Sequence, residues 1–170
     1  MAKAVRFINP EALSKPPTYT QVVEVTGPGR TVFISGQLAT TREGAICEGG
    51  FKAQAEQVYR NLSDALASIG ASFGDVVKLN SYLADIGDLP ILRDVRARYL
   101  VPGSLPASTT LGGLSFARPG ALLEIEAVAV LAAPRRKAAR SNPARTRSAA
   151  RKVKTAARSK TKSRSRGRAR

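Results

Sequence analysis

Histidine is absent from this chain of 170 residues, tryptophan is absent as well, and cysteine occurs once, as Cys47. Without histidine, the Ser-His-Asp triad, His-based acid–base catalysis and His-ligated zinc are excluded. One cysteine forms no internal disulfide and no thiolate metal site, and without a histidine partner it is a poor nucleophile. Catalysis in this chain therefore has to use carboxylates, tyrosine, arginine, hydroxyl groups and backbone amides, and we expect no metal and no cofactor.

Long apolar runs are missing too. No segment approaches the roughly 20 apolar residues of a membrane span, and residues 1–17 contain no apolar run of signal-peptide length. A phosphate-binding glycine motif is also missing, because Gly27-Pro28-Gly29 is too short and precedes no helix. A single cysteine fits a reducing compartment. These features predict a cytoplasmic protein with no membrane contact.

Acidic residues are missing from one end of the chain. Pro134–Arg170 holds sixteen Lys and Arg and no Asp or Glu, whereas the whole chain has 28 basic and 12 acidic residues. Residues 1–133 are therefore formally neutral, and their number is usual for one domain. The basic segment is nearly all Ala, Ser, Thr, Pro, Lys and Arg, which cannot bury enough apolar surface to fold. The sequence predicts a domain over 1–133 and a disordered basic tail over 134–170.

The tail predicts contact with a polyanion. It has no aromatic residue for base stacking, so binding to nucleic acid would go through phosphates, without sequence preference. A solubilising extension, or binding to another polyanion, stays open as an alternative. The candidate nucleic-acid-binding residues are Arg135, Arg136, Lys137, Arg151, Lys152 and Lys154.

Residue patterns predict the first elements of the domain. Two β-branched runs, Gln21–Thr26 and Thr31–Ser35, lie on either side of Gly27-Pro28-Gly29, which predicts a β-hairpin. From Phe51 to Ile69 apolar residues recur every three or four positions, which predicts a helix with one buried face.

The second half of the domain continues the same way. Asp88 stands at an N-cap position before Leu89-Pro90, and a helix is predicted from there to Leu100. The remaining predicted strands are Val76–Ala84, about Ser108–Leu114, and Leu122–Leu131. The order ββαβαββ predicts an α+β fold in which two helices cover one face of a sheet.

The last predicted strand suggests what happens on the other face. Leu122–Val130 is apolar at nearly every position, so we expect both faces of this strand to be buried. A sheet face without a helix is typical of an oligomer interface. Glu124 and Glu126 share one face by the period of two. They are either carboxylates close to that interface or two charges at its rim.

Several short motifs occur in an order that resembles the Rid family of reactive intermediate deaminases, also called YjgF or L-PSP proteins. The resemblance spans about residues 18–131. It implies a homotrimer of chorismate-mutase-like subunits with small-molecule pockets in the clefts between them. It also implies hydrolysis of enamines and imines to keto acids and ammonia. The motifs are Tyr19-Thr20-Gln21, Phe33-Ile34-Ser35-Gly36-Gln37, Ala53-Gln54-Ala55, Asn61-Leu62, Gly74-Asp75-Val76-Val77-Lys78, Tyr99, Pro106-Ala107 and Glu124-Ile125-Glu126-Ala127.

The resemblance assigns roles to particular residues. Glu124 corresponds to the family's catalytic acid, which helps to activate the attacking water. Tyr19 corresponds to a tyrosine that lines the pocket, and Gly36 to a position whose backbone amide lies beside the ligand. The neighbouring Ser35 is included among the candidate substrate-binding residues. Thr110 corresponds to a residue whose main chain meets the ligand.

Two positions depart from the family pattern. In deaminating members an arginine follows the Pro-Ala pair and grips the substrate carboxylate through two parallel hydrogen bonds, but this chain has Ser108 there. The family also places a small amide side chain on the second helix, where this chain has Arg96. Arg96 either moves a positive charge to another wall of the pocket or is an ordinary arginine on the helix surface. We include Arg96 and Ser108 among the candidate substrate-binding residues.

Three functions follow as hypotheses. The first is a Rid-type hydrolase for a small enamine, imine or related metabolite, with its specificity altered at Ser108. The second is a trimeric protein that binds a small ligand without catalysis. The third is a trimeric scaffold that presents three basic tails to nucleic acid.

Overall fold

The computed structural model describes residues 3–133. The predicted tail, with its six candidate nucleic-acid-binding residues, lies outside the described residues. Within the described part, no helix has the length and apolar character needed to cross a membrane. In order, the elements are β1 (Ala4–Ile8), β2 (Val22–Thr26), β3 (Gly29–Leu38), α1 (Gly50–Ala67), the 3₁₀ turn η1 (Phe73–Asp75), β4 (Val76–Leu83), the 3₁₀ turn η2 (Ile86–Asp88), α2 (Leu89–Ala97), β5 (Ala107–Leu111) and β6 (Leu123–Ala132).

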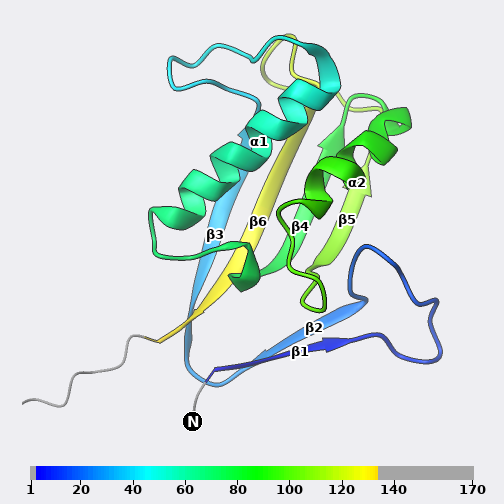
Figure 1. The fold of residues 1–170 in the computed structure, drawn as a ribbon, viewed down its shortest axis with the longest axis vertical. Coiled ribbons are helices and arrows are strands. Elements are labelled where there is room, and N and C mark those ends of the chain that lie inside the picture. The colour runs from blue at the N-terminus through cyan, green and yellow to red at the C-terminus, as the bar shows by residue number, and fades with distance from the viewer. Residues whose placement is uncertain (1–2, 134–170) are drawn as a thin grey trace, which may run out of the picture. The chain divides into compact units, whose positions relative to one another are not determined.

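The main sheet has four strands in the order β3-β6-β4-β5. The β4–β5 pair is parallel, and β6 runs antiparallel to both of its neighbours. Figure 1 shows α1 and α2 side by side on the same face of this sheet. The predicted α+β class, with two helices and a sheet, is confirmed.

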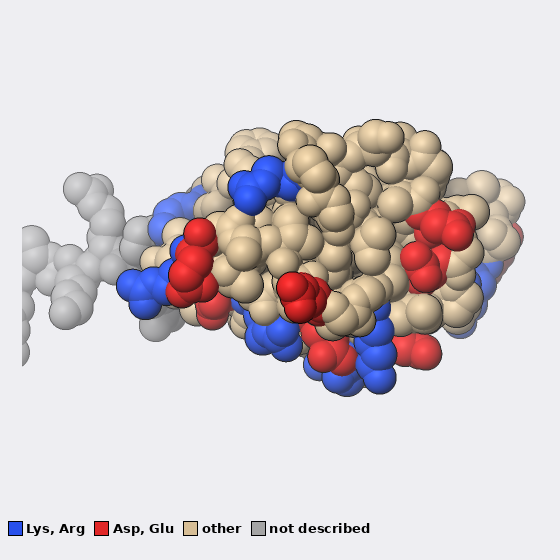
Figure 2. Space-filling view, turned by 90° about the horizontal axis from the view of Figure 1, so that it is seen from above, with Lys and Arg blue, Asp and Glu red and all other residues tan. Residues whose placement is uncertain are grey.

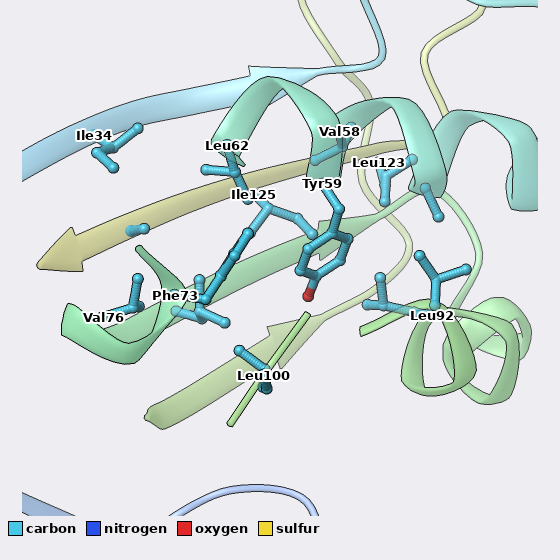
Figure 3. Close-up of a cluster of buried hydrophobic side chains, with 14 of the residues drawn as sticks. Ile34, Val58, Tyr59, Leu62, Phe73, Val76, Leu92, Leu100, Leu123 and Ile125 are labelled. Atoms are coloured by element: carbon cyan, nitrogen blue, oxygen red, sulfur yellow. The ribbon is translucent and has the colours of Figure 1, made fainter. Parts of the chain in front are cut away.

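The hydrophobic core lies between the helices and the sheet. Leu123 and Ile125 of β6 and Leu92 of α2 meet the apolar face of α1 there (Figure 3). Tyr59 stacks on Tyr99 with 4.9 Å between ring centres. The buried residues of α1 repeat every three or four positions, as predicted: Phe51, Gln54, Ala55, Val58, Tyr59, Leu62 and Leu66.

The predicted hairpin of residues 21–26 and 31–35 is wrong in its pairing. Both strands form, but β2 pairs with β1, and β3 pairs with β6 from Gly29 onwards. The strand β1 was not predicted. Gly27 has a φ of 80°, and the chain bends there without closing a hydrogen-bonded turn. The β2 edge that would have paired with β3 pairs instead with the short strand β1, and the β3 edge pairs with the long strand β6.

The sheet face away from the helices is called the open face below. It carries Glu124, Glu126 and Val128 of β6, Phe33 of β3, Lys78, Asn80 and Tyr82 of β4, and Thr109 and Leu111 of β5. Along β6, Leu123, Ile125, Ala127 and Ala129 are buried toward the helices. The alternation confirms that Glu124 and Glu126 share a face.

The surface of the body carries charges of both signs. On the side seen in Figure 2, acidic and basic side chains lie along the lower edge and at both ends of the body, and most of the remaining surface is uncharged. This distribution agrees with the formal neutrality of residues 1–133.

Candidate functional site

Glu124 lies in close contact with the backbone of Gly36. A Cβ atom at position 36 would lie 1.7 Å from the Glu124 Oε1 atom, so only glycine leaves room for this carboxylate. The Glu124 side chain is half-buried. The structure thus brings together two of the residues that the sequence singled out.

A β-bulge produces this contact. Ile34 pairs with Ala127 and Gln37 pairs with Ile125, so Ser35 and Gly36 together lie opposite one residue of β6. A bulge bends its strand and re-aims the local backbone, and bulges are frequent next to active sites. Here the bulge places the Ser35-Gly36 backbone beside the Glu124 carboxylate.

The two carboxylates of the open face have different surroundings. Glu126 Oε1 accepts a hydrogen bond from Asn80 Nδ2 at 2.7 Å and another from Tyr82 Oη at 3.0 Å. The bond to Glu126 raises the pKa of Tyr82 because it favours the protonated phenol, and burial and the two carboxylate charges act in the same direction. Within residues 3–133, by contrast, Glu124 has no side-chain hydrogen bond and no ion pair. Its oxygens are free to act on a ligand.

A second group of candidate residues gathers where α2 meets β5. Arg96 donates from Nη1 to Ser108 Oγ at 3.3 Å and from Nη2 to the Thr18 carbonyl at 3.3 Å. Its side chain is only 4% exposed, so the alternative of an ordinary surface arginine is wrong. Burial lowers the pKa of Arg96, because low-dielectric surroundings disfavour its charged form, although the guanidinium stays protonated.

Tyr19 lies near this second group because the adjacent residue, Thr20, is hydrogen-bonded to the segment before Ser108. The Thr20 hydroxyl donates to the Leu105 carbonyl at 2.6 Å, and the Thr20 amide donates to the Pro106 carbonyl at 3.2 Å. These bonds hold the segment with Tyr19 next to Pro106-Ala107-Ser108. Thr110 lies two residues beyond Ser108 on β5 and shares its side of the strand.

The two groups lie on opposite sides of the sheet. Lys78 Nζ donates to Thr109 Oγ1 at 2.7 Å on the open face, so the neighbouring Ser108 points to the helix side. Glu124, Ser35 and Gly36 are on the open face. One copy of the chain therefore does not bring its catalytic candidate and its Arg96–Ser108 pair into a single pocket.

A pocket lies near each group, although Glu124 and Gly36 line neither of the two. One, of about 200 Å³, lies beside α2 and is lined by Pro17, Thr18, Arg93, Arg96, Ala97, Leu100, Pro102 and Leu105. The other, of about 300 Å³, lies on the open face and is lined by Phe33, Ile34, Ser35, Lys78, Asn80, Glu126, Ala127 and Val128.

Sequence reasoning missed three of the polar residues in these places. Asn80 and Tyr82 alternate along β4 with a period of two, which could have placed them on one face. Arg93 lies one helical turn before Arg96, so its side of α2 could also have been inferred. No group of three or more His, Cys, Asp or Glu side chains within residues 3–133 is arranged to hold a metal ion.

Comparison with known proteins defines the class. The family model described as Endoribonuclease L-PSP matches residues 11–131. Among solved structures, YyfB of Yersinia pestis, a protein of the Rid family, superposes with a TM-score of 0.68 and 34% identity, covering 75% of this chain and 98% of that one. RidA from an Antarctic Psychrobacter gives a TM-score of 0.56 and 34% identity, over 74% of this chain and 99% of that one.

Curated relatives point to the same family. The 2-iminobutanoate/2-iminopropanoate deaminase of Mus musculus is 36% identical over 113 residues, which are 66% of this chain and 80% of that protein. A RutC family protein of Pyrococcus abyssi is 35% identical over 131 residues, or 76% of this chain and 98% of that protein. The chain belongs to the Rid family, also called the YjgF or L-PSP family.

Proposed function

We propose that this protein is a hydrolase that deaminates a small imine or enamine, with Glu124 as the group that activates water. The observation that carries the proposal is the state of Glu124. Its carboxylate lies against the Gly36 backbone and has no hydrogen-bonding side chain or cation among the described residues. The relative from Mus musculus, named as an imine deaminase, supports the same reaction class.

The chemistry requires one base that also returns a proton. Glu124 accepts a proton from water as the water oxygen attacks the C=N carbon. The nitrogen takes up that proton to give a neutral carbinolamine. Glu124 then carries the proton of the new hydroxyl to the nitrogen, so that ammonia leaves as the C=O bond forms. An imine and one water thus give one carbonyl compound and one ammonia, and the reaction needs no oxidant or reductant.

The arrangement of the site supports a trimer in which clefts between subunits complete it. Glu124 and the Arg96–Ser108 pair lie on opposite sides of the sheet in one chain, so a neighbouring subunit is needed to bring one of each together. The open face suits such contact, because Phe33 is 79% exposed and Leu111 is 51% exposed. We propose a homotrimer formed by the described body.

The mode of substrate binding proposed here differs from that of family members with an arginine after Pro-Ala. Ser108 supplies neither the charge nor the planar fork of a guanidinium. We propose that the substrate is therefore not bound by β5 as the family resemblance implies.

A panel of imines tests the function. An amino acid oxidase generates the imines from several amino acids, and the imine that remains is trapped with semicarbazide. We expect the full chain to speed the loss of at least one imine. If none is lost faster than in buffer while the protein binds a keto acid, the protein is a ligand-binding member without catalysis.

The tail supports a separate role. Sixteen positive charges without an acid favour binding to phosphates by counterion release. We propose that the tails attach the protein to nucleic acid without sequence preference.

A further inference from the structure

Arg96 is a buried charge without a counter-charge. It is 4% exposed, yet no carboxylate within residues 3–133 lies at ion-pair distance from its guanidinium. Its acceptors in this part of the chain are one hydroxyl and one carbonyl, each at 3.3 Å, whereas a guanidinium has five N–H donors. A buried charge is costly unless it is paired, so this arrangement is suited to an anion that arrives from outside.

The pocket beside α2 gives that anion a place. Arg96 lines the pocket together with Arg93, which is exposed and makes no ion pair within the described chain. No acidic residue lines it. Leu100, Leu105 and Pro102 supply apolar walls. Its volume, about 200 Å³, suits a small molecule with one anionic end and a short apolar part.

We propose that Arg96, on α2, binds the carboxylate of the substrate, with Ser108 leaving room for its guanidinium. The substrate class is then a small 2-imino or 2-enamino acid with a short apolar side chain. This inference rests on the proposed function and adds the residue that selects the substrate. Arg93 and Arg96 of α2 supply the positive charge of the pocket. On β5, the small hydroxyl of Ser108 accepts a hydrogen bond from the Arg96 guanidinium.

The surroundings of Arg96 favour such a ligand. Burial is the main cause that lowers its pKa, and the charge of Arg93 acts in the same direction, while Tyr59 acts in the opposite one. A carboxylate would oppose both effects by favouring the charged guanidinium. The Tyr59 hydroxyl, near enough for the Arg96 charge to affect its pKa, is fully buried and has no hydrogen-bond partner within the described residues. Two polar groups in this region, the Arg96 guanidinium and the Tyr59 hydroxyl, are therefore not fully satisfied within the described residues.

Binding of pyruvate and of its neutral analogue pyruvamide to the full chain tests the proposal by calorimetry. We expect the wild type to prefer pyruvate. Arg96→Gln should weaken pyruvate binding by at least about 30-fold, since losing one partner of a buried charge pair costs at least about 2 kcal/mol and each 1.4 kcal/mol is a factor of ten. Its binding of pyruvamide should change little.

The matched control is Arg98→Gln. Arg98 follows α2, is exposed, and pairs with Glu56 at 2.8 Å. Its replacement removes the same charge and leaves the tail unchanged, so pyruvate binding should equal that of the wild type. An equal loss in Arg98→Gln and Arg96→Gln would overturn the proposal, because the effect would then reflect net charge.

Two further variants guard against a folding defect in Arg96→Gln. Arg96→Lys keeps the charge but not the fork and should give an intermediate loss. The double variant Arg96→Asn with Ser108→Arg moves the guanidinium to β5 and should recover the preference for pyruvate over pyruvamide. The proposal is overturned if the wild type shows no such preference, or if a folded Arg96 variant without a positive charge at either position retains it.

These results separate the inference from the proposed function. If pyruvate binding depends on Arg96 but the protein hydrolyses no imine, the carboxylate site is supported and the proposed hydrolase activity is contradicted. If the protein hydrolyses an imine but Arg96→Gln leaves pyruvate binding unchanged, the hydrolase activity is supported and the role of Arg96 is contradicted.

Discussion

Single residues decide what the open face can do. Glu124 and Glu126 are two residues apart on one strand and share a face, but Asn80 and Tyr82 hold only Glu126. Hydrogen bonds from neutral donors stabilise a carboxylate in place and occupy its lone pairs. Glu126 is thus suited to a structural role, and Glu124 keeps its oxygens for a ligand.

Gly36→Ala tests the contact between the bulge and Glu124. The added Cβ would lie 1.7 Å from Glu124 Oε1, so the carboxylate has to move. We expect imine hydrolysis to fall at least about tenfold, because misplacing a catalytic group by an ångström can cost a hundredfold. Gly74→Ala is the control, since its Cβ would meet its nearest neighbour at an ordinary 3.5 Å. Wild-type rates in both variants would show that the close contact does not position Glu124.

Tyr59→Phe tests an unsatisfied group in the core. Tyr59 is fully buried and its hydroxyl has no partner within the described residues. An unpaired buried hydroxyl costs roughly 1–3 kcal/mol, so the free energy of unfolding should rise by about 1 kcal/mol, as measured by urea denaturation. Tyr99→Phe, on the half-buried ring that stacks against it, should be near neutral. A loss of stability in Tyr59→Phe would mean that the hydroxyl has a partner.

The same variant has an effect that depends on pH. Burial, as the main cause, raises the pKa of Tyr59 in the folded protein above its ordinary value of about 10. Below pH 10 the phenol is protonated in both the folded and the unfolded chain. Above that pH only the unfolded chain ionises, so the free energy of unfolding declines as the pH rises. Tyr59→Phe should lose less stability than the wild type between about pH 10 and 11. Equal losses would contradict this assignment.

At the scale of elements, the sequence predicted the parts better than their pairing. Periodicity predicted α1, because Val58, Leu62 and Leu66 recur on one face, and the period of two predicted the shared face of Glu124 and Glu126. The partners of β2 and β3 were not predictable from local signals. The register of β3 is set by β6, almost a hundred residues later in the chain.

The candidate site shows the same limit. Ser108 and Arg96 were each identifiable by position, but their contact depends on how α2 packs over β5. Burial of Arg96 was not predictable either, because an arginine on a short helix is exposed far more often than buried. Only the structure shows that the Arg96 guanidinium donates a hydrogen bond to Ser108.

Phe33→Ser tests whether the open face forms the contact between subunits. Phe33 is 79% exposed in one chain, so its replacement should cost the subunit little but weaken assembly, because burying a phenylalanine contributes about 2–3 kcal/mol. Sedimentation should show a smaller assembly for the variant than for the wild type at the same concentration, if the wild type forms the proposed trimer. Leu13→Ser, on an exposed leucine outside the sheet, is the control. A trimer as stable as the wild type would remove Phe33 from the interface.

At the scale of the whole molecule, the two parts to which we assign separate proposed functions differ in charge. Residues 1–133 are formally neutral and the segment 134–170 carries sixteen positive charges. In a trimer, three such segments would bind one polyanion together, since linked contacts raise the effective concentration for the next. The body and the basic segment can thus be tested independently.

A salt titration of duplex DNA binding tests the basic segment. Affinity of the full chain should fall steeply with salt, by a log–log slope of about −0.9 per phosphate neutralised. Removing Pro134–Arg170 should abolish binding and leave the affinity for pyruvate unchanged. Equal DNA binding by the shortened chain would assign it to the body. No binding by the full chain at low salt would make the segment a solubilising extension.

The most direct test of Glu124 as the catalytic base compares Glu124→Gln with Glu126→Gln on an imine that the wild type hydrolyses. Glutamine keeps the shape of glutamate but cannot take a proton from water, and general base catalysis contributes about 100-fold or more. Hydrolysis by Glu124→Gln should therefore fall by about that factor, with the assembly and pyruvate binding intact. Hydrolysis by Glu126→Gln should stay close to the wild-type rate, because its amide oxygen still accepts the bonds of Asn80 and Tyr82. Unchanged hydrolysis in Glu124→Gln, or an equal loss in both variants, would contradict the assignment of Glu124 as the base.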